Sequence, residues 1–388
     1  MRICVIFPTN LALGEGPNRV DHDLMRTWQE SGNEVTVMTG SPVRTEPPGV
    51  RARFSVLNRF LFRLLRSYVW LPRSGGELEE YDVIVDVGRT LTLHLYQRVF
   101  GGRPAFVQFH QNMYMADRIN GRTFVSRIRS FALDYLTISL ARKLIVVSEA
   151  HKKSMVALYG NEEKFVVIPN GVSLPEFKRS RKTRSNSILF VGNLSVHFAS
   201  KGVPTLLKAF SAFAMTSKDC TLVFVGKANP KLGAMCEELG ISERVRHVGV
   251  LDKAALLEQY NRARVLVLPS IMDADPLVVK EAMACGLPVI VSDGVGSKDM
   301  VEAANAGMTF PVNDHVSLRS CLEAIMNDET FASVLGNNGR VYAEGKLGWD
   351  KVAQDYLELF KSGPEAGSEP HRTVPIGPIA AQALRTTG

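Results

Sequence analysis

The stretch DADPLVVKEAMACGLPVIVSD, residues 273–293, decides how this chain is interpreted. It follows an apolar run, ARVLVLPS (263–270), that is typical of a buried strand, and it ends in a second such run, LPVIVSD. Between the two runs, PLVVKEAMAC has the composition of a helix that ends near Gly286 and Pro288. Strand, loop, helix and strand in this order predict a β-α-β unit of a parallel sheet.

The same alternation continues through both halves of the chain. Helical segments such as RVDHDLMRTWQESG (19–32), with Val20, Leu24 and Trp28 on one face, separate short apolar runs. The further predicted strands are RICVIF, EVTVMT, YDVIVDVG, PAFVQFH and KLIVVS in the first half and SILFVGNL, TLVFVGK and RVRHVGVL in the second. We therefore predict an α/β fold of two doubly wound, Rossmann-like domains that face a cleft, because such sheets bind ligands beyond their carboxyl strand ends.

Composition shifts suggest the domain limits. The N-terminal domain is expected over 1–175 and the C-terminal domain over 188–347, joined by a polar and basic linker at 176–187. WDKVAQDYLELFKS (349–362) predicts a terminal amphipathic helix, placed at 348–362, that is a candidate for packing back on the N-terminal domain. Residues 363–388 contain four Pro and four Gly without periodicity and are expected to be disordered.

Charge and cysteine content narrow the classes of function. The 388 residues carry a net charge of +7, and residues 1–170 hold 22 Lys and Arg against 16 Asp and Glu. This basic half suggests an anionic partner: a membrane surface, a nucleic acid or a phosphorylated substrate. Five scattered cysteines, no secretory signal and no run of 18 apolar residues favour a cytoplasmic protein without a membrane span.

Three acids in the opening stretch are candidate functional residues. Asp273 and Asp275 have the Asp-x-Asp spacing that can hold a divalent metal, and Asp275 before Pro276 favours a plain helix cap. Glu281 lies roughly 1.5 turns into the helix, within reach of a ribose diol. Taken singly, Asp273 is explained as a solvated loop acid and Glu281 as a surface residue. Together with the helix N-terminus, which favours a pyrophosphate, they favour a nucleotide cradle.

The opening stretch resembles the E-x(7)-E signature of retaining GT-B glycosyltransferases of group 1, or family 4. FVGNLSVHFASKGVPTLLKAF (190–210) resembles the glycine and Lys-Gly segment of that family. Further segments of the family match four more stretches of this chain: VVSEAHKKSMVALYG, VVIPNGV, LVFVGK and VRHVGVL. The resemblance therefore covers most of the chain. It implies a GT-B fold and a transferase that uses a nucleoside-diphosphate sugar.

The resemblance also implies roles for individual residues. Catalytic roles fall on Lys201, at the diphosphate, Asp273, at the donor sugar, and His110, at the sugar hydroxyls. The implied donor-binding residues are Glu281, Gly14, Gly16, Asn193, Pro276, Leu277, Val278 and Gly249. No metal and no cofactor is expected, and the loop with Gly14 and Gly16 lacks the G-x-G-x-x-G spacing of dinucleotide dehydrogenases. Two positions depart from the family pattern: Asp273 is one methylene shorter than the usual glutamate, and Asn193 replaces an arginine.

FSVLNRFLFRLLRSYVWLPR (54–73) is the remaining distinctive stretch. If it is helical, Leu57, Leu61 and Leu64 form one stripe, and a second stripe is basic, comprising Arg59, Arg63 and Arg66. Such a helix suits an anionic membrane surface, although an ordinary domain helix with an arginine face explains it equally well. Relatives that glycosylate lipid-linked acceptors dock in this way, which favours the membrane.

The resemblance implies a retaining, metal-independent glycosyltransferase of cell-envelope or surface polysaccharide or glycolipid assembly. Its partners would be a nucleotide-sugar donor, a lipid-linked or saccharide acceptor and an anionic membrane surface, with no nucleic acid. The expected location is cytoplasmic, peripheral on the inner face of the membrane. Two alternatives stay open: a catalytically silent nucleotide-sugar-binding or scaffold protein, and a metal-dependent enzyme that uses the Asp-x-Asp motif.

Overall fold

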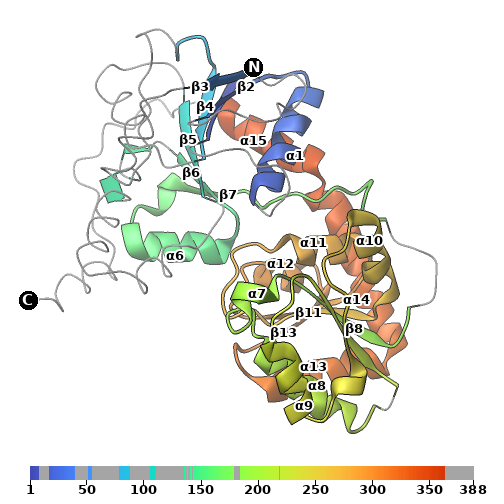
Figure 1. Ribbon diagram of the computed structural model, residues 1–388. Helices are drawn as coiled ribbons and strands as arrows, with labels where there is room; N and C mark the ends of the chain where they lie inside the picture. Colours follow the sequence, from blue (N-terminus) through green and yellow to red (C-terminus); the bar gives the residue numbers. More distant parts are fainter. Residues whose placement is uncertain are drawn as a thin grey trace, which may run out of the picture. The chain divides into compact units, whose positions relative to one another are not determined.

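The computed structural model describes residues 1–7, 17–39, 51–54, 78–87, 105–110, 135–136, 138, 140–141, 143–178, 184–217 and 219–362 (Figure 1). The chain forms two compact units: Met1–Pro169 together with the chain from Val352 onward, and Asn170–Lys351. Each unit contains one parallel sheet with helices, so the predicted α/β class and the pair of doubly wound domains are confirmed. Gly14, Gly16 and the tail 363–388 lie outside the described residues.

The sheet of the first unit has the strand order β3-β2-β1-β4-β5-β6-β7. Its strands are β1 (Arg2–Phe7), β2 (Glu34–Thr39), β3 (Arg51–Phe54), β4 (Val83–Asp86), β5 (Ala105–His110), β6 (Lys143–Val146) and β7 (Phe165–Val167). In the middle, Val5 faces Val37 of β2 and Val85 of β4 in parallel register.

Phe54, the first residue of the basic stretch 54–73, is the last residue of β3. Residues 55–73 lie outside the described part, so the amphipathic helix stays a prediction.

Among the residues that the structure describes, the helical elements of the first unit are α1 (Pro17–Glu30), α6 (Glu149–Tyr159), the short η1 (Glu162–Lys164) and most of α15 (Trp349–Lys361). The predicted face of α1 is confirmed, because Val20, Leu24 and Trp28 are buried. The Trp28 ring lies 5.6 Å from the rings of both Tyr356 and Phe360, so α15 joins this unit through aromatic contacts.

The sheet of the second unit has the order β10-β9-β8-β11-β12-β13. Its strands are β8 (Ser187–Val191), β9 (Thr221–Val225), β10 (Val245–His247), β11 (Val265–Leu268), β12 (Val289–Ser292) and β13 (Gly307–Phe310). Strands β11 and β12 are buried along their whole length, as expected of strands covered on both faces. The edge strands β3, β7 and β13 were not among the strands predicted from the sequence.

The second unit includes part of the predicted linker. Its helices are α7 (Leu194–His197), α8 (Val203–Ala214), α9 (Lys231–Glu238), η2 (Ser242–Arg244), α10 (Lys253–Arg262), α11 (Leu277–Ala284), α12 (Lys298–Ala303), α13 (His315–Asn327), α14 (Glu329–Tyr342) and η3 (Ala343–Leu347). Phe177 is buried among them. The Arg184 guanidinium donates to the carbonyls of Ala263, after α10, and Cys285, after α11, both at 2.9 Å. The compact units divide after Pro169, whereas the predicted end of the N-terminal domain is residue 175.

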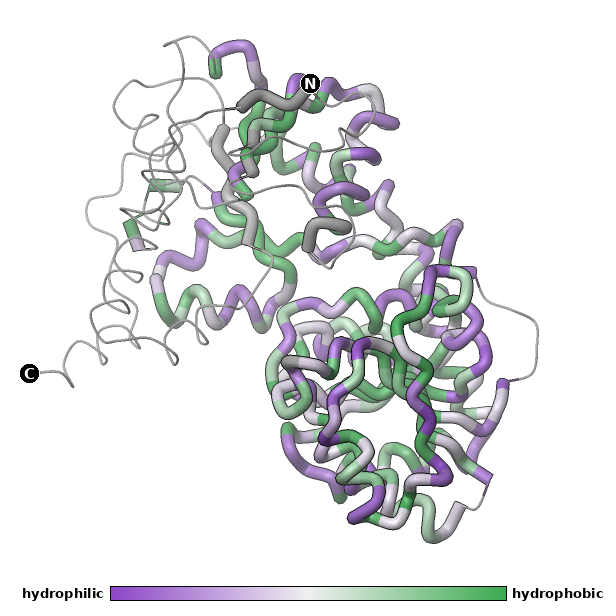
Figure 2. Tube along the Cα trace, viewed as in Figure 1, coloured by the Kyte–Doolittle hydropathy of each residue, from purple (hydrophilic) through white to green (hydrophobic). Residues whose placement is uncertain are grey.

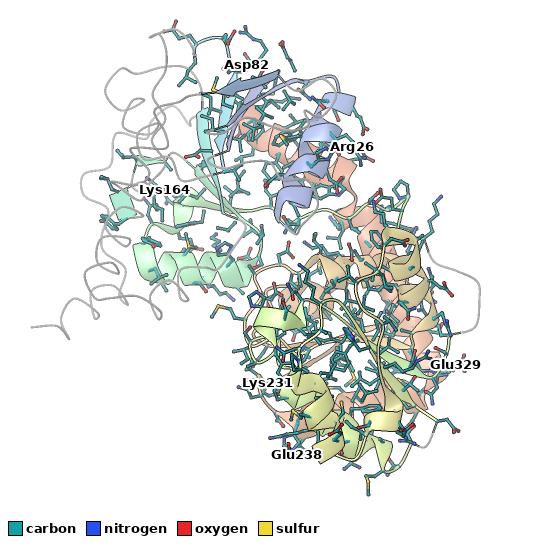
Figure 3. All side chains as sticks on the ribbon, in the orientation of Figure 1. Arg26, Asp82, Lys164, Lys231, Glu238 and Glu329 are labelled. Atoms are coloured by element: carbon teal, nitrogen blue, oxygen red, sulfur yellow. The ribbon has the colours of Figure 1, made fainter. Side chains whose placement is uncertain are left out.

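The hydropathy of the residues differs between the strands and the helices. Figure 2 shows hydrophobic residues concentrated along the strands, whereas hydrophilic residues recur along the helices. Charged side chains such as Lys231 and Glu238, at the two ends of α9, and Glu329, at the start of α14, mark helix termini (Figure 3). None of the described helices has the length and hydrophobicity needed to cross a membrane.

Candidate functional site

The candidate site of the second unit lies where its strand order reverses. Strand β8 pairs with β9 on one side and β11 on the other, so the connections leaving β8 and β11 diverge at this point. Parallel sheets place their ligand-binding loops at such a switch point, beyond the carboxyl strand ends. The two connecting segments concerned are residues 192–202, which follow β8 and include α7, and residues 269–276, which follow β11.

These two segments are held against each other by the backbone. The Ile271 amide donates to the Ser200 carbonyl at 2.8 Å. Gly202 has φ +66°, and a Cβ there would lie 1.8 Å from the Pro269 carbonyl oxygen, so only glycine permits this approach. The approach fixes the backbone of Lys201, which lies between Ser200 and Gly202, beside the loop that follows β11.

Lys201 and Asp273 form an ion pair at this junction. The Lys201 Nζ lies 2.5 Å from the Asp273 Oδ2, and the two side chains are 25% and 19% exposed. The Asp273 backbone is anchored as well, since its carbonyl accepts from the Gly296 amide at 2.6 Å. Asp273 is thus no solvated loop acid and Lys201 no free surface lysine. The pair offers an incoming ligand one fixed cation and one fixed carboxylate.

Asp275 does not cap the helix, so that prediction is wrong. Helix α11 begins at Leu277, one residue later than expected; Pro276 occupies the N-cap position, and no side chain caps the helix. The Asp275 carboxylate instead accepts hydrogen bonds from the Asn170 amide at 2.9 Å and from the Ser297 hydroxyl at 3.1 Å, and pairs with Lys280. The reason is tertiary: these partners surround Asp275 inside the unit and compete successfully with the helix amides.

Lys280 is fully buried, which is rare for a lysine. Burial lowers the pKa of its ammonium group, and the Asp275 carboxylate acts in the opposite direction. Asp273 and Asp275 therefore each pair with a different lysine. In the described ranges, no group of three or more His, Cys, Asp or Glu side chains is arranged to hold a metal ion.

Glu281 is buried and not a surface helix residue. It is 4% exposed, and its Oε2 accepts a hydrogen bond of 2.7 Å from the Tyr260 hydroxyl. The Glu281 carboxylate, hydrogen-bonded by Tyr260, therefore lies about one turn beyond the N-terminus of α11. At that terminus, the first amides, including those of Leu277 and Val278, have no carbonyl partner within the helix and favour an anion.

The remaining predicted residues have defined places. Asn193 caps α7, because its Oδ1 accepts from the Ser195 amide at 3.0 Å and from the Ser195 hydroxyl at 2.7 Å. Gly249 has φ +76° in the turn after β10, and its carbonyl accepts from the Gly226 amide at 2.8 Å. His110 is the last residue of β5, in the first unit. Among the residues predicted to be catalytic, the structure brings Lys201 and Asp273 into direct contact.

Two residues of this region were not predicted from the sequence: Tyr260 and Lys280. Tyr260 lies in α10, 21 positions before its partner Glu281, so no local spacing links them. For Lys280 a signal was present, because this lysine interrupts the apolar run LVVKEAMA. A charge in the buried part of a helix requires a partner, and Asp275 was the nearest acid on its N-terminal side.

The sequence of this chain matches two models of glycosyltransferase families. The family model described as "Glycosyl transferases group 1" matches residues 175–342, and the model described as "Glycosyltransferase Family 4" matches residues 14–175. Each model matches less than half of the 388 residues, and the two together match residues 14–342, so the chain is similar to glycosyltransferases of group 1 over most of its length. The group 1 match includes the whole switch-point region, with Lys201, Asp273 and Glu281.

Individual proteins of this kind resemble the chain at low identity. An uncharacterized glycosyltransferase of Methanocaldococcus jannaschii is 27% identical over 60% of this chain and 63% of its own length. A D-inositol 3-phosphate glycosyltransferase of Catenulispora acidiphila is 25% identical over 59% of each protein. The chain thus spans about three fifths of the length of these relatives. The Anabaena HepE structure in complex with UDP matches 93% of this chain and all of its own, with a TM-score of 0.74 and 16% identity, a likeness of fold.

Proposed function

We propose that this protein is a retaining glycosyltransferase of group 1 that moves a sugar from a nucleoside-diphosphate donor to an acceptor hydroxyl. The observation that carries the proposal is the Lys201–Asp273 pair at the switch point, on the loops next to the α11 N-terminus. A fixed cation and uncapped helix amides suit a diphosphate, and a carboxylate beside them suits sugar hydroxyls. The Glu281 carboxylate on the same helix suits a ribose diol.

Each of these groups has a role in the proposed reaction. The acceptor oxygen forms a bond to the anomeric carbon on the face from which the diphosphate oxygen departs, and the acceptor proton passes to the departing phosphate. Lys201 and the first amides of α11 stabilise the negative charge that develops on the diphosphate. Asp273 orients the donor sugar. Roles for His110 and for Gly14 and Gly16 rest on the family resemblance alone.

We further propose that the reaction needs no metal ion and no cofactor. Metal-dependent transferases use a divalent cation to neutralise the diphosphate, a task that the Lys201 ammonium performs in this proposal. HepE of Anabaena forms solved complexes with UDP and with UDP-glucose, which supports a nucleotide-sugar donor for this chain and makes UDP-sugars the first candidates. A role in envelope or surface polysaccharide or glycolipid assembly follows from the resemblance and is part of the proposal.

The membrane part of the proposal rests on residues 54–73. Their arginines would bind anionic headgroups at the inner face of the membrane, where a lipid-linked acceptor is present. Replacing Arg59, Arg63 and Arg66 with Glu should abolish co-sedimentation with vesicles of anionic phospholipid. Neutral vesicles serve as the control for charge, and unchanged co-sedimentation of the triple variant would remove this part of the proposal.

The central test is release of nucleotide from a panel of UDP-, GDP- and ADP-sugars, with and without EDTA. Release from one donor that is unaffected by EDTA supports a metal-independent transferase and identifies the base. Loss of release in EDTA would contradict metal independence. Binding of a nucleotide without turnover, even with acceptor extracts, would favour the silent binding protein, an alternative motivated by Asn193 and the shorter Asp273.

A further inference from the structure

The carboxylate of Glu281 is held by a side chain from a different helix. The Tyr260 hydroxyl, on α10, donates to the Glu281 Oε2 at 2.7 Å. Tyr260 is fully buried, so water does not compete for its hydroxyl, and Glu281 is 4% exposed. A hydrogen bond from a neutral donor to a buried carboxylate is among the stronger ones in proteins, because the acceptor is charged.

Tyr260 is itself fixed from two directions by the segment that precedes β8. The Phe177 ring meets the Tyr260 ring edge-on, with centroids 6.0 Å apart and planes at 73°. The Arg184 guanidinium donates to the Tyr260 backbone carbonyl at 2.8 Å. Ring and backbone are therefore both held, and the hydroxyl has little freedom to leave Glu281.

A glutamate side chain has three rotatable torsions, and a ribose contact requires one orientation of its carboxylate. Preparing that orientation before the ligand arrives avoids the cost of ordering it on binding. We infer that Tyr260 is a positioning residue, which holds the Glu281 carboxylate for the ribose hydroxyls of the donor. This inference rests on the proposed function, because it takes Glu281 as the ribose-binding residue.

The test compares ligands that differ only in the ribose. Binding of the nucleoside diphosphate selected by the donor panel is measured by calorimetry against its 2′-deoxy and 3′-deoxy forms, for the wild type, Tyr260→Phe, Glu281→Gln and the double variant. Tyr260→Phe keeps the ring that packs on Phe177 and removes only the hydroxyl. Tyr342→Phe, a half-buried tyrosine on α14, is the matched control.

We expect Tyr260→Phe to weaken binding of the ribonucleotide by up to about tenfold, because the Glu281 side chain must then be ordered when the ligand binds. For at least one deoxy form the loss should shrink to less than about threefold, because the hydroxyl that Glu281 would hold is absent. The double variant should bind no more weakly than Glu281→Gln. In turnover assays the donor KM of Tyr260→Phe should rise with kcat changed less than about twofold.

The outcomes separate the inference from the proposed function. An equal loss for the ribonucleotide and both deoxy forms would mean that Tyr260 only supports the fold, which overturns the inference alone. No binding of any nucleoside diphosphate to the wild type would overturn the proposed function and the inference together. Partial unfolding of the variant would not imitate the expected result, because it lowers binding of all ligands equally.

Discussion

The buried Asp275–Lys280 pair offers the most direct test of the structure, through the substitution Lys280→Met. Methionine keeps most of the buried aliphatic stem and removes the charge. The Asp275 carboxylate, whose side chain is 2% exposed, then stays buried without a cation. The Asn170 amide and the Ser297 hydroxyl remain as its hydrogen-bond donors.

The expected cost follows from these contacts. Removing one partner of a buried pair costs about 3–5 kcal/mol, and the two remaining donors favour the lower half of that range, about 3–4 kcal/mol. For a unit of this size, that corresponds to a melting temperature lower by about 6–16 °C. Urea unfolding, followed by fluorescence and circular dichroism, measures the loss directly.

A double variant and a surface control complete the experiment. Asp275→Asn with Lys280→Met removes both charges and keeps a side-chain oxygen for one donor, so it should recover most of the stability. Lys298→Met breaks an exposed pair with Glu302, 3.8 Å apart, and should cost less than about 1 kcal/mol. If Lys280→Met cost no more than Lys298→Met, or if the double variant were the least stable of the three, the reasoning would be refuted.

Three further predictions concern catalysis, pH and thiols. Lys201→Ala should lower turnover by about 10²–10³, roughly 3 kcal/mol for one preorganised charge contact, in an assay of nucleotide release. Stability should fall with acid through His151, because burial lowers the pKa of its imidazole to about 4 from 6.5. The folded protein then binds fewer protons than the unfolded chain between these values, so about 2 kcal/mol is lost from pH 7 to pH 5, and His151→Leu should abolish this loss. The five cysteine thiols, all buried, should be inert to an aromatic disulfide reagent until denaturant is added; burial raises the pKa of Cys220 and Cys285 to about 12.

Each of these predictions has a result that would contradict it. Lys208→Ala, an exposed position on α8, is the control for Lys201→Ala, and equal activity of the two variants would remove Lys201 from the reaction. An unchanged difference in stability between wild type and His151→Leu at pH 5 and pH 7 would exclude His151 as the titrating group. Rapid reaction of a thiol without denaturant would show that at least one cysteine is accessible.

Much of the fold could be predicted from the chain alone. Strand and helix patterns are local: the alternation of VLVL, LVVKEAMA and VIVS is visible over a few residues and dictates a β-α-β unit. The helix α1 and the terminal helix α15 were recognisable from their apolar faces. Because parallel sheets bind ligands at their switch points, the loops around Lys201 and Asp273 could also be selected in advance.

Which carboxylate meets which cation was decided only by the tertiary structure. Lys201 and Asp273 are 72 positions apart, and the Asn170 amide reaches Asp275 across 105 positions. A local rule assigned Asp275 to the helix N-terminus, since aspartate before proline usually caps. In the folded unit a buried carboxylate needs a neutralising partner more than a helix needs a cap, and the chain places Lys280, Ser297 and Asn170 around it.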